Sequence, residues 1–287
     1  MVSKLTKVNL TNLDKILYPE PKITKGQVIE YYIRIAPALL DLLNDRPIVM
    51  TRYPNGIDAE SFYEKDIPRG TPPWVKTSTK YSEVAKRNIN YVLCNDLDTL
   101  IWLANLAALE LHITLAKASA FDNPDILFFD LDPQPPASFD QVVSVSLLLK
   151  ETLEELGLKS YVKTSGKRGL HIALPIKGQY SFEQTRGFVH TVAQYLSKKS
   201  DIVDSQFRRK KVPGTIYVDY RQNSHGRTMV SPYSLRATPQ GTVSAPIEWG
   251  EVKKELKPEM LTLLTVGKSE RRPWEGFLLN RQKLDVS

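Results

Sequence analysis

The chain has 287 residues, a length that allows one large mixed domain or two smaller ones. Hydrophobic residues make up 41% and charged residues 25% of it, close to the globular average, which excludes a disordered or fibrous protein. The single cysteine, Cys94, excludes an internal disulfide and a zinc site of paired cysteines. The sequence has no apolar run of the ~18 residues that a membrane helix needs, and its start has no signal-like apolar segment. We therefore expect a cytoplasmic protein.

The charge of the chain is basic and unevenly distributed. Lysine and arginine number 39 against 32 acidic residues. Between residues 202 and 236 there are seven basic residues and two acidic ones, so most of the excess lies there. Such a segment can bind polyanions such as nucleic acids or nucleotides, or it can be a solvated surface. Charge alone leaves both interpretations open.

The first part of the chain is predicted to mix helices and strands. In order, the patterns indicate a helix over residues 24–44, two strands within 47–65 joined by a turn at 54–56, a loop over 67–74, and a buried helix over 95–112. Thr24 can cap the first helix, and Pro37 is expected to kink or break it. The second helix is expected to end at His112.

A more regular alternation follows. The patterns predict a strand over 126–133, a helix over 138–157, a strand pair within 160–176, a helix over 181–199, and strands over 215–220 and 227–237. Strands interleaved with helices in this way favour a mixed α/β fold over a helical bundle or a sandwich. Residues beyond about 258 are expected to form a peripheral helix and tail.

Two aspartates, Asp130 and Asp132, stand at the end of the apolar strand predicted at 126–133. Side chains two apart on a strand face the same side, and a bound divalent cation relieves the repulsion between two carboxylates. A pair of such cations is the usual device for nucleotidyl transfer. Asp219 ends a second apolar strand, although it could instead pair with Arg221 or Arg227. Oxygen ligands favour magnesium or manganese, and the four histidines show no zinc spacing.

A glycine turn over residues 165–171 offers backbone N–H groups, the Ser165 hydroxyl and the cations of Lys167 and Arg168. These groups suit a triphosphate, and a plain basic turn is the alternative. Phe62 and Tyr63 could stack on bases, but in a strand one of two neighbours normally faces the core.

Ordered motifs along the chain add to this interpretation. They are Leu10-Thr11-Asn12-Leu13-Asp14-Lys15, Tyr31-Tyr32, Arg46-Pro47, Trp74, Leu109-Glu110-Leu111-His112, Asp130-Leu131-Asp132-Pro133, Ser165 to His171, Asp219-Tyr220-Arg221-Gln222-Asn223, Tyr233-Ser234-Leu235-Arg236 and Pro246-Ile247-Glu248-Trp249. With them the chain resembles the polymerase domain of bacterial ligase D, one of the prokaryotic end-joining polymerases of the archaeo-eukaryotic primase superfamily. The resemblance covers nearly the whole chain. It implies a primase-like core of sheets flanked by helices, in a single domain over 1–287. That domain would comprise a DNA-end-binding part at about 1–90, a catalytic core at about 91–250 and a tail at about 251–287.

The resemblance implies a stand-alone template-directed polymerase that adds nucleotides, preferably ribonucleotides, to 3′ ends at gaps and breaks. Asp130, Asp132 and Asp219 would be catalytic and hold two Mn²⁺ or Mg²⁺ ions, with no zinc. The implied nucleotide contacts are His112, Ser165, Lys167, Arg168, His171 and Arg236, with Ser165 near the ribose 2′-hydroxyl. The implied DNA contacts are Lys15 and Lys25 at the downstream 5′-phosphate, Phe62 and Tyr63 on template bases, and the basic run Arg208, Arg209, Lys210 and Lys211.

The resemblance also implies partners. These are DNA with a 5′-phosphate at gaps or double-strand breaks, nucleoside and deoxynucleoside triphosphates, a separate ATP-dependent DNA ligase and a Ku-type protein. No membrane is expected, and the protein would lie with the nucleoid of a prokaryote. Two other functions stay open: a replicative-type primase subunit, although such subunits commonly carry a zinc-binding insert, and a non-catalytic protein that bridges DNA ends.

Overall fold

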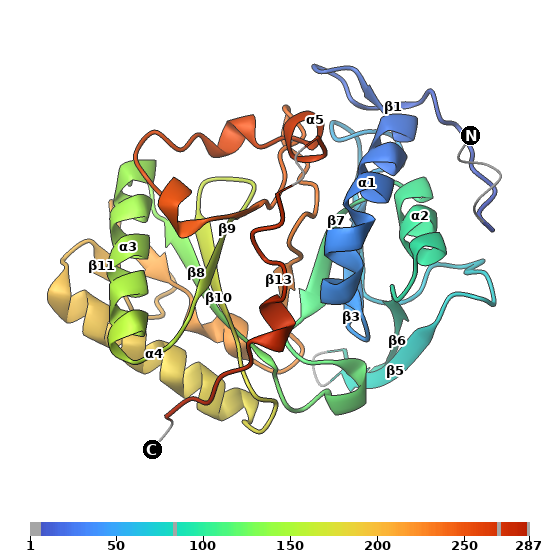
Figure 1. Cartoon of the computed structure of the whole chain (residues 1–287). Helices are drawn as coiled ribbons and strands as arrows, with labels where there is room; N and C mark the ends of the chain where they lie inside the picture. Colours follow the sequence, from blue (N-terminus) through green and yellow to red (C-terminus); the bar gives the residue numbers. More distant parts are fainter. Residues whose placement is uncertain (1–6, 83–84, 269–270, 286–287) are drawn as a thin grey trace. The chain divides into compact units, whose positions relative to one another are not determined.

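The computed structural model describes residues 7–82, 85–268 and 271–285. It has a mixed α/β fold, as predicted, in two compact units (Figure 1). Unit 1 comprises residues 1–114, 228–245 and 259–271, and unit 2 comprises residues 115–227, 246–258 and 272–287. The expected division into parts at 1–90, 91–250 and 251–287 stays a prediction. Of these parts, residues 1–6, 83–84, 269–270 and 286–287 lie outside the described residues.

Unit 1 is built on a sheet with the strand order β13-β7-β3-β6-β5, and β4 pairs with β3. Its strands are β3 (Pro47–Arg52), β4 (Phe62–Glu64), β5 (Thr77–Ser82), β6 (Arg87–Leu93), β7 (Ala108–Thr114) and β13 (Thr228–Val230), with β1 (Ile16–Tyr18) and β2 (Ile23–Thr24) in a separate pair. Its helices are α1 (Lys25–Leu43), α2 (Leu97–Asn105) and α5 (Leu263–Val266). Helices α1 and α2 pack against each other (Figure 1).

Helix α1 begins where the sequence predicts. The Thr24 hydroxyl accepts a hydrogen bond from the Gln27 N–H, and the Gln27 side chain accepts one from the Thr24 N–H. The predicted break at Pro37 is wrong, because the helix continues to Leu43. Apolar side chains on both sides of Pro37 are buried in the same core, and this packing outweighs the lost backbone hydrogen bond.

The predicted helix over 95–112 is only half correct. Helix α2 ends at Asn105, Ala107 takes a left-handed φ of 56°, and the chain continues as strand β7. His112 therefore lies in a strand. Strand β7 pairs with β13 and β3, and consecutive side chains along it are buried, so both of its faces are largely covered. Burial on both faces removes the alternation that identifies a strand, and the apolar run then imitates a buried helix.

Unit 2 is built on a sheet with the strand order β11-β12-β8-β10-β9-β14. Its strands are β8 (Ile126–Pro133), β9 (Tyr161–Thr164), β10 (Leu170–Pro175), β11 (Val203–Asp204), β12 (Ile216–Val218) and β14 (Pro246–Ile247). Helices α3 (Phe139–Glu155) and α4 (Phe182–Lys199) pack against β8 (Figure 1). Capping boxes at Ser138 and Ser181 start both helices. All of the long elements predicted here are present, but the two late strands are shorter than predicted.

The end of the chain contributes to the core of unit 2. Trp274 stacks on Phe277, with ring centroids 4.6 Å apart, and both rings meet Tyr161 edge to face. Phe277 is completely buried, and the Trp274 indole N–H donates to the carbonyl of Val162. The expectation of a peripheral tail is therefore wrong for these residues.

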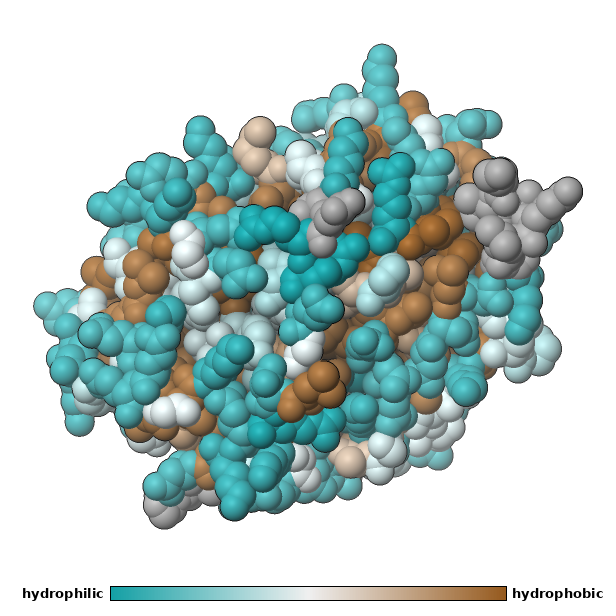
Figure 2. Space-filling view, in the orientation of Figure 1, coloured by the Kyte–Doolittle hydropathy of each residue, from teal (hydrophilic) through white to brown (hydrophobic). Residues whose placement is uncertain are grey.

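One face of the surface is mostly polar. Figure 2 shows hydrophilic residues over most of one face, with hydrophobic residues in small groups between them. Large exposed apolar side chains such as Leu279 and Met260 are present. Over residues 7–82, 85–268 and 271–285, none of the helices combines the length and the apolar character that crossing a membrane requires.

Candidate functional site

The sheet of unit 2 places two of the predicted aspartates opposite each other across paired backbone segments. Asp130 and Asp132 lie on β8, and Asp219 directly follows β12, which runs antiparallel to β8. The backbone N–H of Asp219 donates to the carbonyl oxygen of Asp130 at 3.0 Å. Asp219 thus lies opposite Asp130, and Asp132 is two residues from Asp130 on the same strand, so strand pairing places Asp130 near both of the others.

Burial raises the pKa of Asp132 and of Asp219, and the charge of nearby Asp130 raises both further. Each carboxylate is therefore poorly stabilised as an anion. Asp219 has some compensation, because its Oδ1 accepts hydrogen bonds from the Arg221 N–H at 3.1 Å and the Tyr217 hydroxyl at 3.3 Å. A further positive charge near these side chains would stabilise their ionised forms.

Strand β10 extends the row of polar side chains. His171 faces Asp130 in the antiparallel register, and its Nε2 lies 3.3 Å from Asp130 Oδ1. Its Nδ1 lies 2.7 Å from the Nζ of Lys163, a completely buried lysine on β9. These two contacts link Lys163, His171 and Asp130 in a row of polar side chains across β9, β10 and β8.

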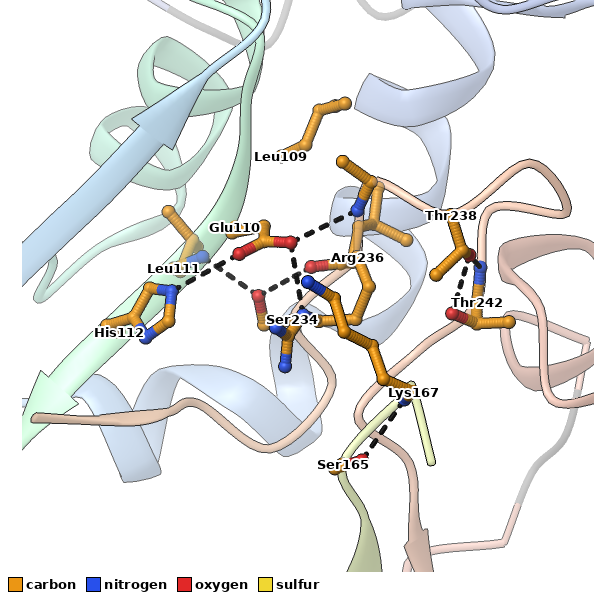
Figure 3. Close-up of polar contacts among 12 residues, drawn as sticks. Leu109, Glu110, Leu111, His112, Ser165, Lys167, Ser234, Arg236, Thr238 and Thr242 are labelled. Atoms are coloured by element: carbon orange, nitrogen blue, oxygen red, sulfur yellow. Dashed lines mark hydrogen bonds and ion pairs between the residues drawn. The ribbon is translucent and has the colours of Figure 1, made fainter. Parts of the chain in front are cut away.

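The turn between β9 and β10 holds the predicted phosphate-binding residues. The Ser165 hydroxyl accepts hydrogen bonds from the backbone N–H groups of Lys167 at 3.1 Å (Figure 3) and Gly169 at 3.0 Å. Lys167 and Arg168 are exposed, and the charge of Arg168 lowers the pKa of Asp132 against the larger effect of burial. The turn thus presents two cations beside the aspartates.

Gly169 explains how closely this turn approaches β8. A Cβ atom at this position would lie within 3.0 Å of the carbonyl oxygen of Leu131, a separation that real Cβ atoms essentially never show. Only glycine therefore allows the turn to pack this closely, one residue from Asp132.

His112 and Arg236 meet around a carboxylate in unit 1. Nε of Arg236 lies 3.1 Å from Glu110 Oε1, and Nε2 of His112 lies 3.5 Å from Glu110 Oε2 (Figure 3). The backbone N–H of Ala237 also donates to Oε1. The sequence motif at 109–112 contains Glu110 but does not indicate that its carboxylate contacts both Arg236 and His112. This contact depends on strand β7 and on a segment far along the chain.

Lys15 and Lys25 lie together in unit 1. The backbone N–H of Lys25 donates to the carbonyl of Lys15 at 2.8 Å. Burial lowers the pKa of Lys25, and the positive charge of Lys15 lowers it further. Their ammonium groups bond to neutral oxygens, Lys25 to Thr11 and Lys15 to Asn55. Two ammonium groups this close to each other form a suitable site for an anion.

Phe62 and Tyr63 lie on β4, an edge strand that pairs with β3. Their exposed fractions are 41% and 59%, so the expectation that one of them faces the core is wrong. Strand β4 is only three residues long and lies off the main strand order of the sheet, and it leaves both of these side chains open to solvent. Both rings are available to stack on a ligand.

The basic run 208–211 lies next to an exposed aromatic residue. The Arg221 guanidinium stacks over the Phe207 ring at 3.7 Å, and Nζ of Lys211 lies 2.8 Å from the centroid of the Tyr217 ring. Burial lowers the pKa of Lys211, although the nearby Asp219, Asp204 and Asp132 act against this effect. Lys211 is thus directed toward the aspartates, whereas Arg208, Arg209 and Lys210 are exposed.

Asn223 is a second residue whose role the sequence did not reveal. Its side chain is completely buried, and it bonds to both backbone groups of Phe128 on β8, accepting from the N–H at 3.0 Å and donating to the carbonyl at 2.6 Å. It therefore continues the pairing with β8 after β12 has ended, and it fixes the segment that follows Asp219.

The fold belongs to the class of primase-polymerase domains. The solved structure described as "Polymerase Domain from Mycobacterium tuberculosis Ligase D in complex with DNA" is similar to this chain with a TM-score of 0.88 and 29% sequence identity, and the match covers 96% of this chain and 100% of that one. The family model "LigD, primase-polymerase domain" matches residues 24–274. The chain belongs to this family.

Curated relatives are longer than this chain. The "Bifunctional non-homologous end joining protein LigD" of Bacillus subtilis is 33% identical over 286 residues, which is 98% of this chain and 46% of the relative. The "Multifunctional non-homologous end joining DNA repair protein LigD" of Mycobacterium tuberculosis H37Rv is 34% identical over 257 residues, which is 86% of this chain and 33% of the relative. The chain therefore spans about half of one and a third of the other.

Proposed function

We propose that this chain is a template-directed polymerase that adds nucleotides to 3′ ends at gaps and broken DNA ends during non-homologous end joining. The observation that carries the proposal is the pairing of Asp219 with Asp130, two residues from Asp132, within a chain of the LigD primase-polymerase family. The names of the relatives refer to non-homologous end joining, and the similar solved structure is a complex with DNA.

Asp130, Asp132 and Asp219 are the proposed ligands of two Mn²⁺ or Mg²⁺ ions. The donor set fits, because it offers hard oxygens, and burial and mutual repulsion raise the pKa of Asp132 and of Asp219. Among the described residues, no group of three or more histidine, cysteine, aspartate or glutamate side chains has the arrangement of a metal site. Magnesium usually binds one or two carboxylates and completes its shell with water and substrate phosphates. When bound, such ions lower the pKa of an attacking hydroxyl and neutralise charge on the phosphates.

The proposed nucleotide contacts are cations, hydrogen-bond donors and one hydroxyl group. In unit 2, Lys167 and Arg168 supply cations on a turn that Ser165 holds in shape, and Nε2 of His171 lies 3.3 Å from Asp130 Oδ1. In unit 1, His112 and Arg236 supply donors for phosphate oxygens. Ser165 is the proposed contact of the ribose 2′-hydroxyl and thereby the source of a ribonucleotide preference.

DNA is proposed to bind through three groups of residues. Lys15 and Lys25 would hold the 5′-phosphate of the downstream strand, because two ammonium groups lie together there. Phe62 and Tyr63 would stack on template bases, and residues 208–211 would contact phosphates of the backbone. End joining also needs DNA ends to be held and sealed, so a Ku-type protein and an ATP-dependent DNA ligase are the proposed partners.

Primer extension on a gapped duplex with a 5′-phosphate tests the proposal. The wild-type protein with Mn²⁺ should extend the primer, with ribonucleotides faster than deoxyribonucleotides, and Asp130→Ala should abolish extension while DNA binding persists. The matched control is Asp125→Asn, which neutralises another buried unit 2 carboxylate, paired with Arg281 3.5 Å away. This control should extend like the wild type.

Other outcomes point to other functions. A wild-type protein that binds the phosphorylated gap tightly but never extends a primer, with Mn²⁺ or with Mg²⁺, would be a non-catalytic end-bridging protein. A dinucleotide product formed from template and nucleotides alone would instead identify a primase activity.

A further inference from the structure

Glu110 is a buried carboxylate with several donors around it. It lies on β7, where the register places it opposite Thr51, and only 6% of its surface is exposed. A buried carboxylate is costly unless donors compensate its charge. Here the donors come from Arg236, Ala237 and His112 (Figure 3).

The backbone around Arg236 has several anchors besides the bond from the Ala237 N–H to Glu110. The bonds that hold it are Ser231 N–H to Leu111 O at 2.8 Å, Leu111 N–H to Ser234 Oγ at 2.8 Å, Arg236 N–H to Thr242 O at 2.8 Å, and Tyr18 O–H to Arg236 O at 3.2 Å. Each of these bonds uses a backbone group of the segment or of β7. Besides its bond with the Ala237 N–H, the carboxylate contacts two side chains, the guanidinium of Arg236 and the imidazole of His112, and it can fix their orientation.

The two carboxylate oxygens of Glu110 contact different partners. Oε1 meets Nε of Arg236 and the N–H of Ala237, and Oε2 meets Nε2 of His112. The side chains of Arg236 and His112 keep 11% and 19% of their surfaces exposed, so a ligand can reach both. A single carboxylate thus links two donor side chains that come from distant parts of the sequence.

We propose that Glu110 is a positioning residue for nucleotide binding, which holds His112 and Arg236 in the orientation in which they contact phosphate oxygens. This inference rests on the proposed function. The charge of Glu110 acts in the opposite direction, because a carboxylate near a polyanion repels it. Orientation and charge therefore predict opposite effects on nucleotide affinity when Glu110 is neutralised.

Titration calorimetry with a nucleoside triphosphate and Mn²⁺, without DNA, distinguishes the orientation effect of Glu110 from its charge effect. Glu110→Gln should bind the nucleotide about tenfold more weakly, which corresponds to about 1.4 kcal/mol. Glu110→Asp keeps the charge but withdraws the oxygens from both partners, and it should also bind more weakly. The control Asp125→Asn removes a comparably buried carboxylate and should bind like the wild type.

A double-mutant cycle tests whether Glu110 acts through Arg236. In an Arg236→Gln background, Glu110→Gln should cause a smaller additional loss of nucleotide affinity than it causes in the wild type. Thermal unfolding of each variant shows whether the loss reflects unfolding, and Glu110→Asp provides a folded variant if Glu110→Gln is unstable.

The outcomes separate this inference from the proposed function. If the wild type binds no nucleotide, the proposed function fails and the inference fails with it. If the wild type binds and both Glu110 variants bind equally well or more tightly, the positioning role is refuted while the proposed function stands.

Discussion

Replacing Gly169 by alanine tests whether the turn at 165–169 depends on its close approach to β8. The added Cβ would lie within 3.0 Å of the Leu131 carbonyl oxygen, whereas an ordinary contact needs at least 3.4 Å. The Leu131 carbonyl belongs to strand β8 and the Cβ would be fixed to the backbone of the turn, so neither group can rotate away and the turn must move from β8. Overpacking of this kind costs about 1–3 kcal/mol. We expect Gly169→Ala to lower the free energy of unfolding by this amount, measured by urea denaturation.

A second glycine provides a control in which alanine should change the stability in the opposite direction. Gly187 lies inside α4, and a Cβ there would have no neighbour within 4 Å. Because glycine is unfavourable inside a helix, Gly187→Ala should stabilise the protein by about 0.5–1 kcal/mol. The separation of β8 from the turn should also displace Asp132, so Gly169→Ala should lose primer extension and Gly187→Ala should retain it. A Gly169→Ala protein as stable as the wild type would refute the reasoning.

Three further predictions concern buried or paired polar groups. Asn223→Leu leaves both backbone groups of Phe128 without their side-chain partner, so it should cost about 2–5 kcal/mol in urea denaturation, and a loss below 1 kcal/mol would contradict this role. The pKa of Asp219 is higher in the folded than in the unfolded protein, so the folded protein binds more protons between the two pKa values. The free energy of unfolding therefore falls as the pH rises from about 4 through the folded-state pKa. Asp219→Asn should therefore unfold at a higher temperature than the wild type at pH 7 in EDTA. The difference in unfolding temperature should vanish below about pH 4, and an equal difference at pH 3 would refute the raised pKa of Asp219 as its cause. Lys25→Gln should reduce the preference for a phosphorylated over an unphosphorylated gap in equilibrium binding, and an unchanged preference would exclude Lys25 from phosphate recognition.

Much of unit 2 could be predicted from the sequence. Strand β8 has the predicted bounds, and α3 and α4 begin directly after Ser138 and Ser181, where the predicted helix ranges start. These elements have clear local signals: an apolar run that ends at proline, and capping boxes before amphipathic helices. Strand β7 was mistaken for helix because burial on both faces hides its period, and the left-handed Ala107 that separates it from α2 has no local signal.

The candidate site was predictable where its residues carry local signals. Asp130, Asp132 and Asp219 end apolar strands, and their proximity follows from the pairing of those strands. Lys163 and Asn223 could not be found in this way, because each acts through a partner on another strand. The contact of Glu110 with Arg236 likewise joins residues separated by 126 positions, and only the folded chain brings them together.

The most direct test of the account is single-nucleotide incorporation on four gapped duplexes that differ only in the template base opposite the gap. With Mn²⁺, the wild-type protein should add the nucleotide complementary to each template base, and Asp132→Asn should add none while it still binds the gap. Addition that ignores the template base, or incorporation by Asp132→Asn at the wild-type rate, would contradict the claim that this aspartate cluster catalyses template-directed synthesis.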